Sequence, residues 1–483
     1  MKNIIFLKRK STLFIILCIC ITFSCKKVLN PDVIQLPTSE NAFSSGADID
    51  KGIAAAYGFL RIAVPDKVFL FNDVRANTFA SYSDNVNVAV ETPIPRNTQT
   101  SLLANGGGDW RSFYKVISQC NLILEKIPTI ANYDAETKKR HLGEASFIRA
   151  LSYFYLVRFW GDVPINLKSI DIDIIKRNPQ TEVLQLINKD LDIAIANLKP
   201  FYNAGDRAVR ATKGAAWAIK AHVKAWQQDY SSCEKLCDSV ITNGQYTMVK
   251  DTTNLISIFI GKTSEGIFEL NNDASLKEVQ MNRIYYRTMH LPYYNNGGIG
   301  AQVLLFPPPD MRSQMFPKGV RDARLRTWFV ANTFGYTSTN YPYLGKYRTL
   351  QASGDTTSKN INESNVIITR LPDIMLLRAE ALASSQLNRT PEAITLLNKV
   401  RERAYAPLYL GGGSIQDTIL LERRKELLGE GQIFFDLVRT RKLDKYSRIT
   451  DANWYARGAW LLPIDQSIIA KSNFVITQNS FWQ

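Results

Sequence analysis

The segment GEASFIRALSYFYLVRFWGDVP, residues 143–164, decides the fold because almost all of it is apolar. Between Ala145 and Trp160 the only polar residues are Ser146, Arg149, Ser152 and Arg158. A helix that is apolar on nearly all sides must be surrounded by other elements. We therefore predict a buried helix, about 24 Å long, that ends at the turn formed by Gly161 and Pro164. A membrane span is disfavoured, because the run falls short of about 20 residues and contains two arginines.

Helical periodicity extends on both sides of this segment. A body helix is predicted from Ala47 to Arg61, and a single apolar stripe at residues 184–198 predicts another helix. Further helices come in pairs with small residues at intervals, which is typical of the tetratricopeptide helix–turn–helix pattern. The pairs are expected at residues 211–241, 371–404 and 415–441, with Thr390 as a cap. At 483 residues the chain exceeds one ordinary core, so a helical array fits its length.

Two regions break the helical pattern. Residues 72–108 contain many asparagines and end in three glycines, which predicts a long polar loop. Residues 262–365 are rich in glycine, proline, asparagine and tyrosine, which predicts loops with a few short strands. We therefore expect an irregular, loop-rich lobe inserted in a mainly helical scaffold.

The N-terminus has the features of a bacterial lipoprotein signal. Four basic residues precede an apolar run, Leu13 to Ile21, and the small residue Ser24 precedes Cys25. The sequence predicts cleavage after residue 24, acylation of Cys25 and a tether at residues 25–45. The alternative is a secreted or N-terminally anchored protein without lipid. No later run is apolar enough to span a bilayer, so a lipid would be the membrane attachment.

The charge of the chain is strongly basic, and removal of the four basic residues in the signal lowers the formal +15 to +11. Nucleic acid is disfavoured as a partner, because the sequence contains no zinc-knuckle spacing, RNA-binding aromatic motif or arginine-rich tract. The basic clusters at residues 138–140 and 423–425 are predicted to be solvated helix faces. A preference for an acidic glycan is the alternative.

Cysteine and histidine spacing gives no metal or disulfide framework. Cys120, Cys233 and Cys237 remain after the signal and the lipid site. Cys233 and Cys237 lie four residues apart on a predicted helix, where side-chain roots are too far apart for a disulfide. All three are expected to be buried thiols, and no histidine has zinc-ligand spacing with a cysteine.

Catalysis is not indicated by any motif. Glu422 and Glu426, with the arginines between them, are predicted to form ion pairs along one helix rather than a catalytic set. Asp171 and Asp173 could serve as the carboxylate pair of a glycosidase, but they follow the buried helix in a turn and nothing nearby indicates a raised pKa. The sequence therefore predicts a protein that is not an enzyme and has no cofactor.

Seven motifs, in order along the mature chain, resemble the SusD/RagB family of outer-membrane nutrient-binding lipoproteins. They are GEASFIRALSYFYLVRFWGDVP at 143, EGIFEL at 265, KYR at 346, ITRLPDIMLLRAEAL at 368, LLNKVRERA at 396, ERRKELLGEGQIFFDLVRTRKL at 422 and WLLPID at 460. This chain departs from the usual family residues at Ile433, Arg441, Asp465 and 479–481, all in scaffold motifs. The resemblance covers nearly the whole mature chain.

The resemblance implies a tetratricopeptide-like helical-repeat scaffold with an inserted lobe. The implied divisions are a signal peptide at 1–24, a tether at 25–45, a SusD-like helical region at 46–261 and a C-terminal SusD/RagB region at 262–483, with its loop-rich insertion at 262–365. It also implies a lipid-anchored protein on the outer face of the outer membrane, closing over a SusC-like TonB-dependent transporter.

Ligand binding is assigned to two polar aromatic stretches, because sugar capture uses aromatic planes together with amides. The predicted ligand residues are Tyr82, Asn85, Asn87, Tyr285, Tyr286, Tyr293, Tyr294 and Asn295. Trp110 and Trp160 are excluded, because they lie in scaffold motifs. The predicted function is non-catalytic binding of an oligosaccharide and its delivery to the transporter. The alternatives are peptide binding and a structural helical-repeat scaffold for surface proteins.

Overall fold

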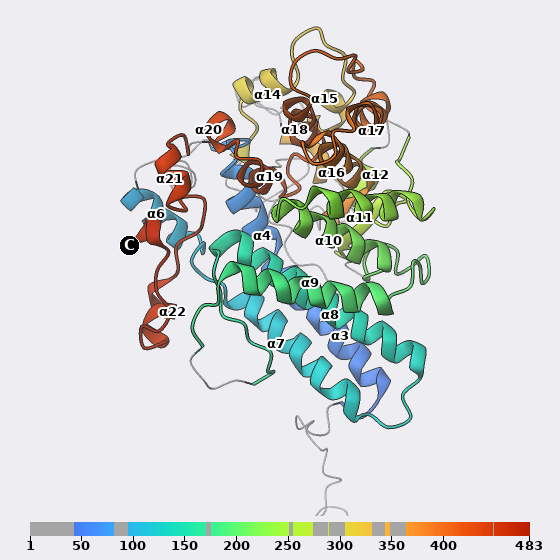
Figure 1. Ribbon diagram of the computed structural model, residues 1–483, viewed down its shortest axis with the longest axis vertical. Coiled ribbons are helices and arrows are strands. Elements are labelled where there is room, and N and C mark those ends of the chain that lie inside the picture. The colour runs from blue at the N-terminus through green and yellow to red at the C-terminus, as the bar shows by residue number, and fades with distance from the viewer. Residues whose placement is uncertain are drawn as a thin grey trace, which may run out of the picture.

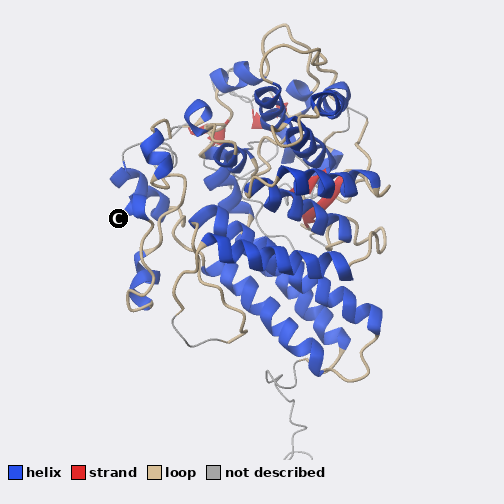
Figure 2. Cartoon of the chain, in the orientation of Figure 1, coloured by secondary structure: helices blue, strands red, loops and turns tan. Residues whose placement is uncertain are grey.

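The fold is mainly helical, with a few short strands, as Figure 2 shows. The structure is a computed structural model that describes residues 43–81, 95–170, 175–250, 255–273, 288, 305–330, 343–347, 364–447 and 449–483. The predicted fold class, a tetratricopeptide-like helical scaffold with an irregular lobe, is confirmed.

Four helices form the bundle in the lower part of Figure 1. They are α3 (Gly46–Ala63), α7 (Arg111–Lys126), α8 (Ala135–Trp160) and α9 (Gln180–Asn197). α8 packs against the other three, which confirms the prediction of a surrounded central helix. Its two arginines are stabilised within the protein: Arg149 forms a bidentate ion pair with Asp190 at 2.8 Å, and Arg158 stacks on the ring of Phe435.

The end of α8 is fixed by glycine and by a buried tryptophan. Gly161 has a φ of 75°, in the left-handed region that favours glycine, and it stops the helix as predicted. Trp160 is fully buried and donates its indole N–H to the carbonyl oxygens of Gly107 and Pro463. Trp110 is buried beside it, with the ring centroids 6.0 Å apart. Both tryptophans belong to the core.

Helical pairs continue the array towards the C-terminus. They are α10 (Lys213–Trp226) with α11 (Tyr230–Thr242), α16 (Leu371–Ala383) with α17 (Thr390–Arg403), and α18 (Ile415–Glu426) with α19 (Ile433–Arg439). α9 contacts α10 and α11 contacts α16, so the pairs form one continuous stack. The capping role predicted for Thr390 is wrong, because Thr390 is the first helical residue and the preceding cap, Arg389, makes no side-chain cap bond.

The inserted lobe departs from the stack between α11 and α16 and returns to it through paired strands. Its strands are β2 (Gly266–Leu270), β3 (Leu305–Phe306), β4 (Phe329–Val330), β5 (Tyr343–Leu344) and β6 (Val366–Arg370). Its helices are α12 (Ser257–Ile260), α14 (Pro309–Met315), α15 (Arg324–Thr327) and the 3-10 turn η3 (Gly345–Tyr347). β2 pairs antiparallel with β6, and β4 pairs antiparallel with β5. The predicted short strands are therefore confirmed where the lobe is described.

The described parts of residues 72–108 do not form the long polar loop that the sequence predicts. They contain the second half of the π-helix η1 (Phe69–Val74), strand β1 (Ala80–Ser81) and helix α6 (Pro95–Ala104). Asn72 is fully buried, and its side-chain oxygen accepts from the backbone N–H of Phe434 at 2.8 Å. The prediction failed because a buried asparagine with a tertiary partner looks the same in sequence as a loop asparagine.

The remaining elements close the fold. They are α4 (Pro65–Val68), η2 (Ile127–Thr129), α20 (Leu443–Tyr446), α21 (Ala452–Ala456), α22 (Gln466–Lys471) and η4 (Ser480–Trp482). The main core runs from α3 to Trp482, and a smaller apolar cluster lies under α16, α17 and α18. Cys120, Cys233 and Cys237 are buried free thiols, as predicted.

Membrane-spanning helices and metal-binding clusters are both absent from the described residues. None of the helices there is long and apolar enough to cross a membrane. Within the same residues, His, Cys, Asp and Glu side chains form no group of three that could hold a metal ion.

Candidate functional site

The functional residues predicted from the sequence lie outside the described part of the chain. The ligand-binding candidates among them are Tyr82, Asn85, Asn87, Tyr285, Tyr286, Tyr293, Tyr294 and Asn295. Cys25 and the acidic pair Asp171 and Asp173 also fall outside it. Their roles stay predictions. The structure does describe the residues that flank the two polar aromatic segments.

A two-stranded ribbon joins the ends of both polar aromatic segments. β1 ends at Ser81, immediately before Tyr82, and β3 begins at Leu305, after the segment that contains Asn295. The strands are antiparallel and Ser81 pairs with Leu305. The chain therefore leaves β1 and enters β3 at the same end of the ribbon, so two segments far apart in the sequence share one attachment point.

The segment before the ribbon is tied to the C-terminal half of the chain. Asp73, fully buried in η1, accepts backbone N–H groups from Gly429 at 3.0 Å and Gly431 at 2.7 Å. Burial raises the pKa of Asp73 to about 7, although both N–H bonds favour the ionised form. Gly431 has a φ of 74°, and an added Cβ would collide with Val68. These contacts fix the base of the ribbon against the loop between α18 and α19.

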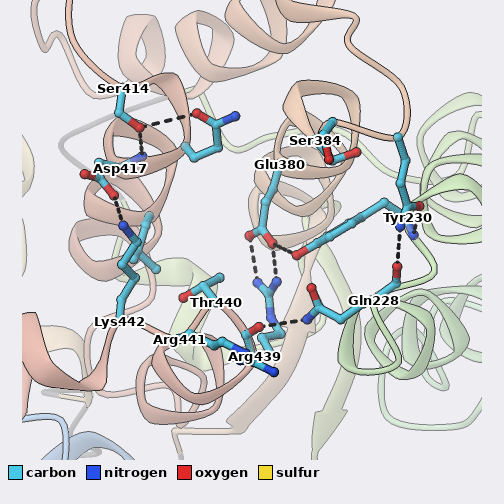
Figure 3. Close-up of a pocket in the computed structure, with 14 residues that line it drawn as sticks. Gln228, Tyr230, Glu380, Ser384, Ser414, Asp417, Arg439, Thr440, Arg441 and Lys442 are labelled. Atoms are coloured by element: carbon cyan, nitrogen blue, oxygen red, sulfur yellow. Dashed lines mark hydrogen bonds and ion pairs between the residues drawn. The ribbon is translucent and has the colours of Figure 1, made fainter. Parts of the chain in front are cut away.

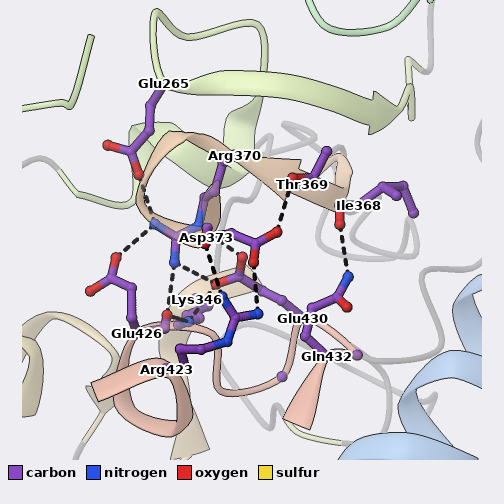
Figure 4. Close-up of polar contacts among 12 residues, drawn as sticks. Glu265, Lys346, Ile368, Thr369, Arg370, Asp373, Arg423, Glu426, Glu430 and Gln432 are labelled. Atoms are coloured by element: carbon purple, nitrogen blue, oxygen red, sulfur yellow. Dashed lines mark hydrogen bonds and ion pairs between the residues drawn. The ribbon is translucent and has the colours of Figure 1, made fainter. Parts of the chain in front are cut away.

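A buried network of charges joins the inserted lobe to the helical array (Figure 4). Arg370, at the end of β6, lies 2.7 Å from Glu265 and Glu426 and 2.8 Å from Glu430. Lys346 in η3 donates to Glu430 at 2.7 Å and to the carbonyl oxygen of Glu426 at 2.7 Å. All five side chains are almost fully buried. Such a network fixes relative positions, because each buried charge needs its partners.

The acidic residues of α18 take part in this network and do not pair along their own helix. Glu422 forms ion pairs with Arg324 at 2.6 Å and with Arg401 at 2.9 Å. Burial opposes the ionisation of Glu426, but Arg403 and neighbouring arginines hold its pKa well below the usual range. The expected ion pairs within the helix are therefore wrong, although the side chains are structural as expected. Their partners come from distant segments that helical spacing does not reveal.

The prediction of a solvated face at residues 423–425 is also wrong. Arg423 is fully buried and pairs with Asp436 at 2.7 Å. Arg424 is almost fully buried and lies over the ring of Tyr446, 4.0 Å from its centroid. Burial lowers the pKa of Arg424 to about 10. These cations are covered because α14, α16, α17 and α19 pack against α18, and Tyr446 of α20 lies against Arg424.

A polar pocket of about 540 Å³ opens where five helices of the array begin or end. Its walls come from the residues after α10, the start of α11, the end of α16, the start of α18 and the end of α19. They are Gln228, Tyr230, Glu380, Ser384, Ser385, Gln386, Ser414, Gln416, Asp417, Leu420, Arg439, Thr440, Arg441 and Lys442. Figure 3 shows Asp417 and Lys442 on one side, with Gln228 and Tyr230 on the other. The volume is in the range of small-ligand sites.

The pocket was not predicted from the sequence. Its residues are polar side chains just beyond apolar helices, and such residues usually end helices without forming a site. The feature of the sequence that corresponds to the pocket is a charged or amide side chain at each of several helix ends. Only the packing of five ends around one space makes that pattern meaningful.

Comparison with known proteins agrees with this architecture. The family model described as "Starch-binding associating with outer membrane" matches residues 30–224, and the model of the SusD family matches residues 329–482. The fold and these matches define a class of glycan-binding proteins that associate with the outer membrane. The chain belongs to the SusD/RagB family.

Similar proteins cover almost the whole chain. A SusD-like protein, P38, from Formosa agariphila is 27% identical and aligns with 89% of this chain and 91% of its own length. A solved SusD homolog from Bacteroides thetaiotaomicron has a TM-score of 0.78 and is 27% identical, with coverage of 92% of this chain and 99% of its own. The surface glycan-binding protein A of the same bacterium is 20% identical, covers 91% and 99% of the two chains, and shares the fold with a TM-score of 0.73.

Proposed function

We propose that this protein binds an oligosaccharide at the cell surface, without catalysis, and delivers it to a SusC-like TonB-dependent transporter. The observation that carries the proposal is the β1–β3 ribbon, which attaches both predicted ligand segments at one end. A family of glycan-binding proteins supplies the ligand class. Similar proteins include one named for laminarin binding, a further reason to propose a glycan.

The ligand site is proposed to combine residues from both segments. Tyr82, Asn85 and Asn87 follow β1 directly, and Tyr293 and Tyr294 precede β3 in the sequence. Tyrosine rings offer apolar planes for sugar faces, and amides meet hydroxyl groups. A shared attachment point lowers the entropic cost of bringing the two segments to one ligand, because the ribbon already holds one end of each segment.

A non-catalytic role is supported by how the carboxylates of the polar pocket are used. Glu380 pairs with Arg439 at 2.8 Å, and Asp417 pairs with Lys442 at 3.1 Å. A glycosidase needs one carboxylic acid with a raised pKa beside a second carboxylate. Both carboxylates of this pocket are instead engaged in ion pairs with basic side chains.

Membrane attachment is proposed to occur through an acylated Cys25, with the protein facing the cell exterior. The family's association with the outer membrane supports this location.

The partnership with the transporter is tested by solubilising outer membranes in mild detergent and purifying the protein. A barrel-sized protein should be recovered with it, in an interface well above about 1,000 Å². Recovery of this protein alone under those conditions would contradict the partnership.

The ligand site is tested by combining a glycan array with titration calorimetry. Replacing Tyr293 and Tyr294 together by alanine should abolish weak binding, because each stacking ring contributes roughly 1 kcal/mol. The melting temperature should stay near that of the wild type. Tyr405→Ala removes a half-exposed tyrosine elsewhere and is the matched control. Unchanged affinity in the double variant would show that the ligand site is elsewhere. Binding of peptides but not glycans would show that the ligand is a peptide.

A further inference from the structure

The residues that line the polar pocket include none of those assigned to the ligand from the sequence. Its residues come from α11, α16, α18 and α19 and from the turns beside them, all within the helical array. None belongs to the β1–β3 ribbon. A cavity of about 540 Å³ can accept a small ligand, so the question is which chemical groups remain available in it.

Both acidic side chains of the pocket are already neutralised. Glu380 receives two bonds from the guanidinium of Arg439 and one from the hydroxyl of Tyr230 at 3.0 Å. Asp417 pairs with Lys442 at 3.1 Å and with Lys445 at 3.3 Å. A cationic ligand would therefore compete with existing ion pairs for these carboxylates.

Arg441 is the cation of the pocket that has no carboxylate partner among the described residues. Its guanidinium lies 6.0 Å from the ring centroid of Tyr455, and the residue is exposed. Arg439 and Lys442, by contrast, are both held in ion pairs. The pocket thus has one positive charge in excess, located at Arg441.

The backbone holds Arg441 in an unfavourable conformation for arginine. Its φ is 56°, in the left-handed region that glycine adopts most easily. Two bonds fix the turn: the N–H of Arg441 donates to Val438, and the N–H of Lys442 donates to Leu437 at 2.9 Å. A non-glycine residue at such a position is a reason to look for a function of its side chain.

Amide groups in the pocket are oriented and keep spare donors. Gln416 donates one amide hydrogen to the carbonyl oxygen of Ala383 at 2.8 Å, and Gln386 donates one to that of Gln228 at 2.7 Å. An amide nitrogen carries two hydrogens, so each glutamine retains one. Ser385 adds an exposed hydroxyl. Fixed amides and an unpaired guanidinium on the walls of one pocket suit a ligand that carries hydroxyl groups and one carboxylate.

We propose that this pocket is a second saccharide site, specific for a sugar that carries a carboxylate, such as a uronic acid. Arg441 binds the carboxylate, and Gln386 and Gln416 bind ring hydroxyls. This inference rests on the proposed function in one respect, which is that the ligand is a saccharide. It adds a binding site in the helical array that is independent of the polar aromatic segments.

The test compares trigalacturonic acid with neutral galactotriose by titration calorimetry of the full mature protein. The acidic trisaccharide should bind more tightly, and higher salt should weaken that preference. Arg441→Gly should lower the affinity about tenfold or more, because a bond to a charged group is lost. Glycine suits the φ at this position, so the variant should fold. Arg441→Lys should retain part of the affinity.

Two controls separate this site from the proposed loop site. Arg326→Ala removes another exposed arginine, on α15, and should leave the affinity unchanged. The Tyr293 and Tyr294 double variant should also bind the acidic trisaccharide as the wild type does. Wild-type affinity in Arg441→Gly, or equal binding of the two trisaccharides, would overturn the proposal. If other glycans bind and depend on the two tyrosines, the proposed function stands even when this pocket fails.

Discussion

Removing Arg370 tests the interpretation of the buried charge network as the joint between the inserted lobe and the helical array. Its guanidinium makes five hydrogen bonds to Glu265, Glu426 and Glu430, and its side chain is completely buried. Burial opposes the charge of Arg370, but Glu430 and Glu426 raise its pKa above the usual value. The guanidinium is therefore ionised at all accessible pH values.

The variant Arg370→Met replaces the guanidinium by an apolar side chain and removes one cation from among three buried glutamates. Lys346 and Arg403 contact the same glutamates, and Arg324 also pairs with Glu426 at 3.0 Å, but Glu265 and Glu430 both lose the guanidinium of Arg370. Breaking a buried ion pair on one side typically costs about 3–5 kcal/mol. That is a large part of the roughly 5–15 kcal/mol by which folded domains are stable. We expect the free energy of unfolding to fall by about this amount.

Urea unfolding followed by tryptophan fluorescence measures the effect. Arg111→Met is the matched control, because Arg111 also forms a bidentate pair, with Asp109, but on the surface. That variant should unfold close to the wild-type midpoint, since exposed pairs contribute little. A loss below about 1 kcal/mol in Arg370→Met would refute the reasoning, since it would mean that the three glutamates do not need this partner.

Three further predictions concern other parts of the molecule. Burial raises the pKa of Glu269 from its usual 4.5 to about 7, so between these pH values the folded state holds a proton that the unfolded state has lost. Wild-type stability should therefore fall by up to about 1.4 kcal/mol per pH unit from pH 4.5 to 7 and level off above 7, and Glu269→Gln should remove this slope in unfolding titrations at pH 4 to 8. Gly431→Ala should destabilise the protein by about 2–5 kcal/mol, because alanine is strained at a left-handed φ and its Cβ would clash with Val68. Gly412→Ala, at a φ of 96° with no atoms near the added Cβ, should show the strain alone, and equal shifts in melting temperature for the two variants would contradict the clash. Labelling with a fatty-acid analogue should disappear in Cys25→Ala, and persistent label would show that the lipid is elsewhere.

Local sequence patterns predicted the scaffold because they report local physics. The segment 143–164 is apolar on all sides, so burial was the only stable outcome for α8. The pairs α10–α11 and α16–α17 were visible from small and apolar residues at helical spacing. Gly161 ended its helix for a reason that lies within one turn of the chain.

Tertiary structure alone decided which charges are buried and where polar groups meet. Glu426 and Arg423 look like solvated residues at helical spacing, yet their partners Arg370 and Asp373 lie about 50 residues away in the chain. The β1–β3 ribbon and the pocket at Arg441 likewise unite segments separated by long stretches of sequence. Side-chain spacing encodes the face of one helix, whereas the free energy of a buried charge depends on groups that folding brings from elsewhere.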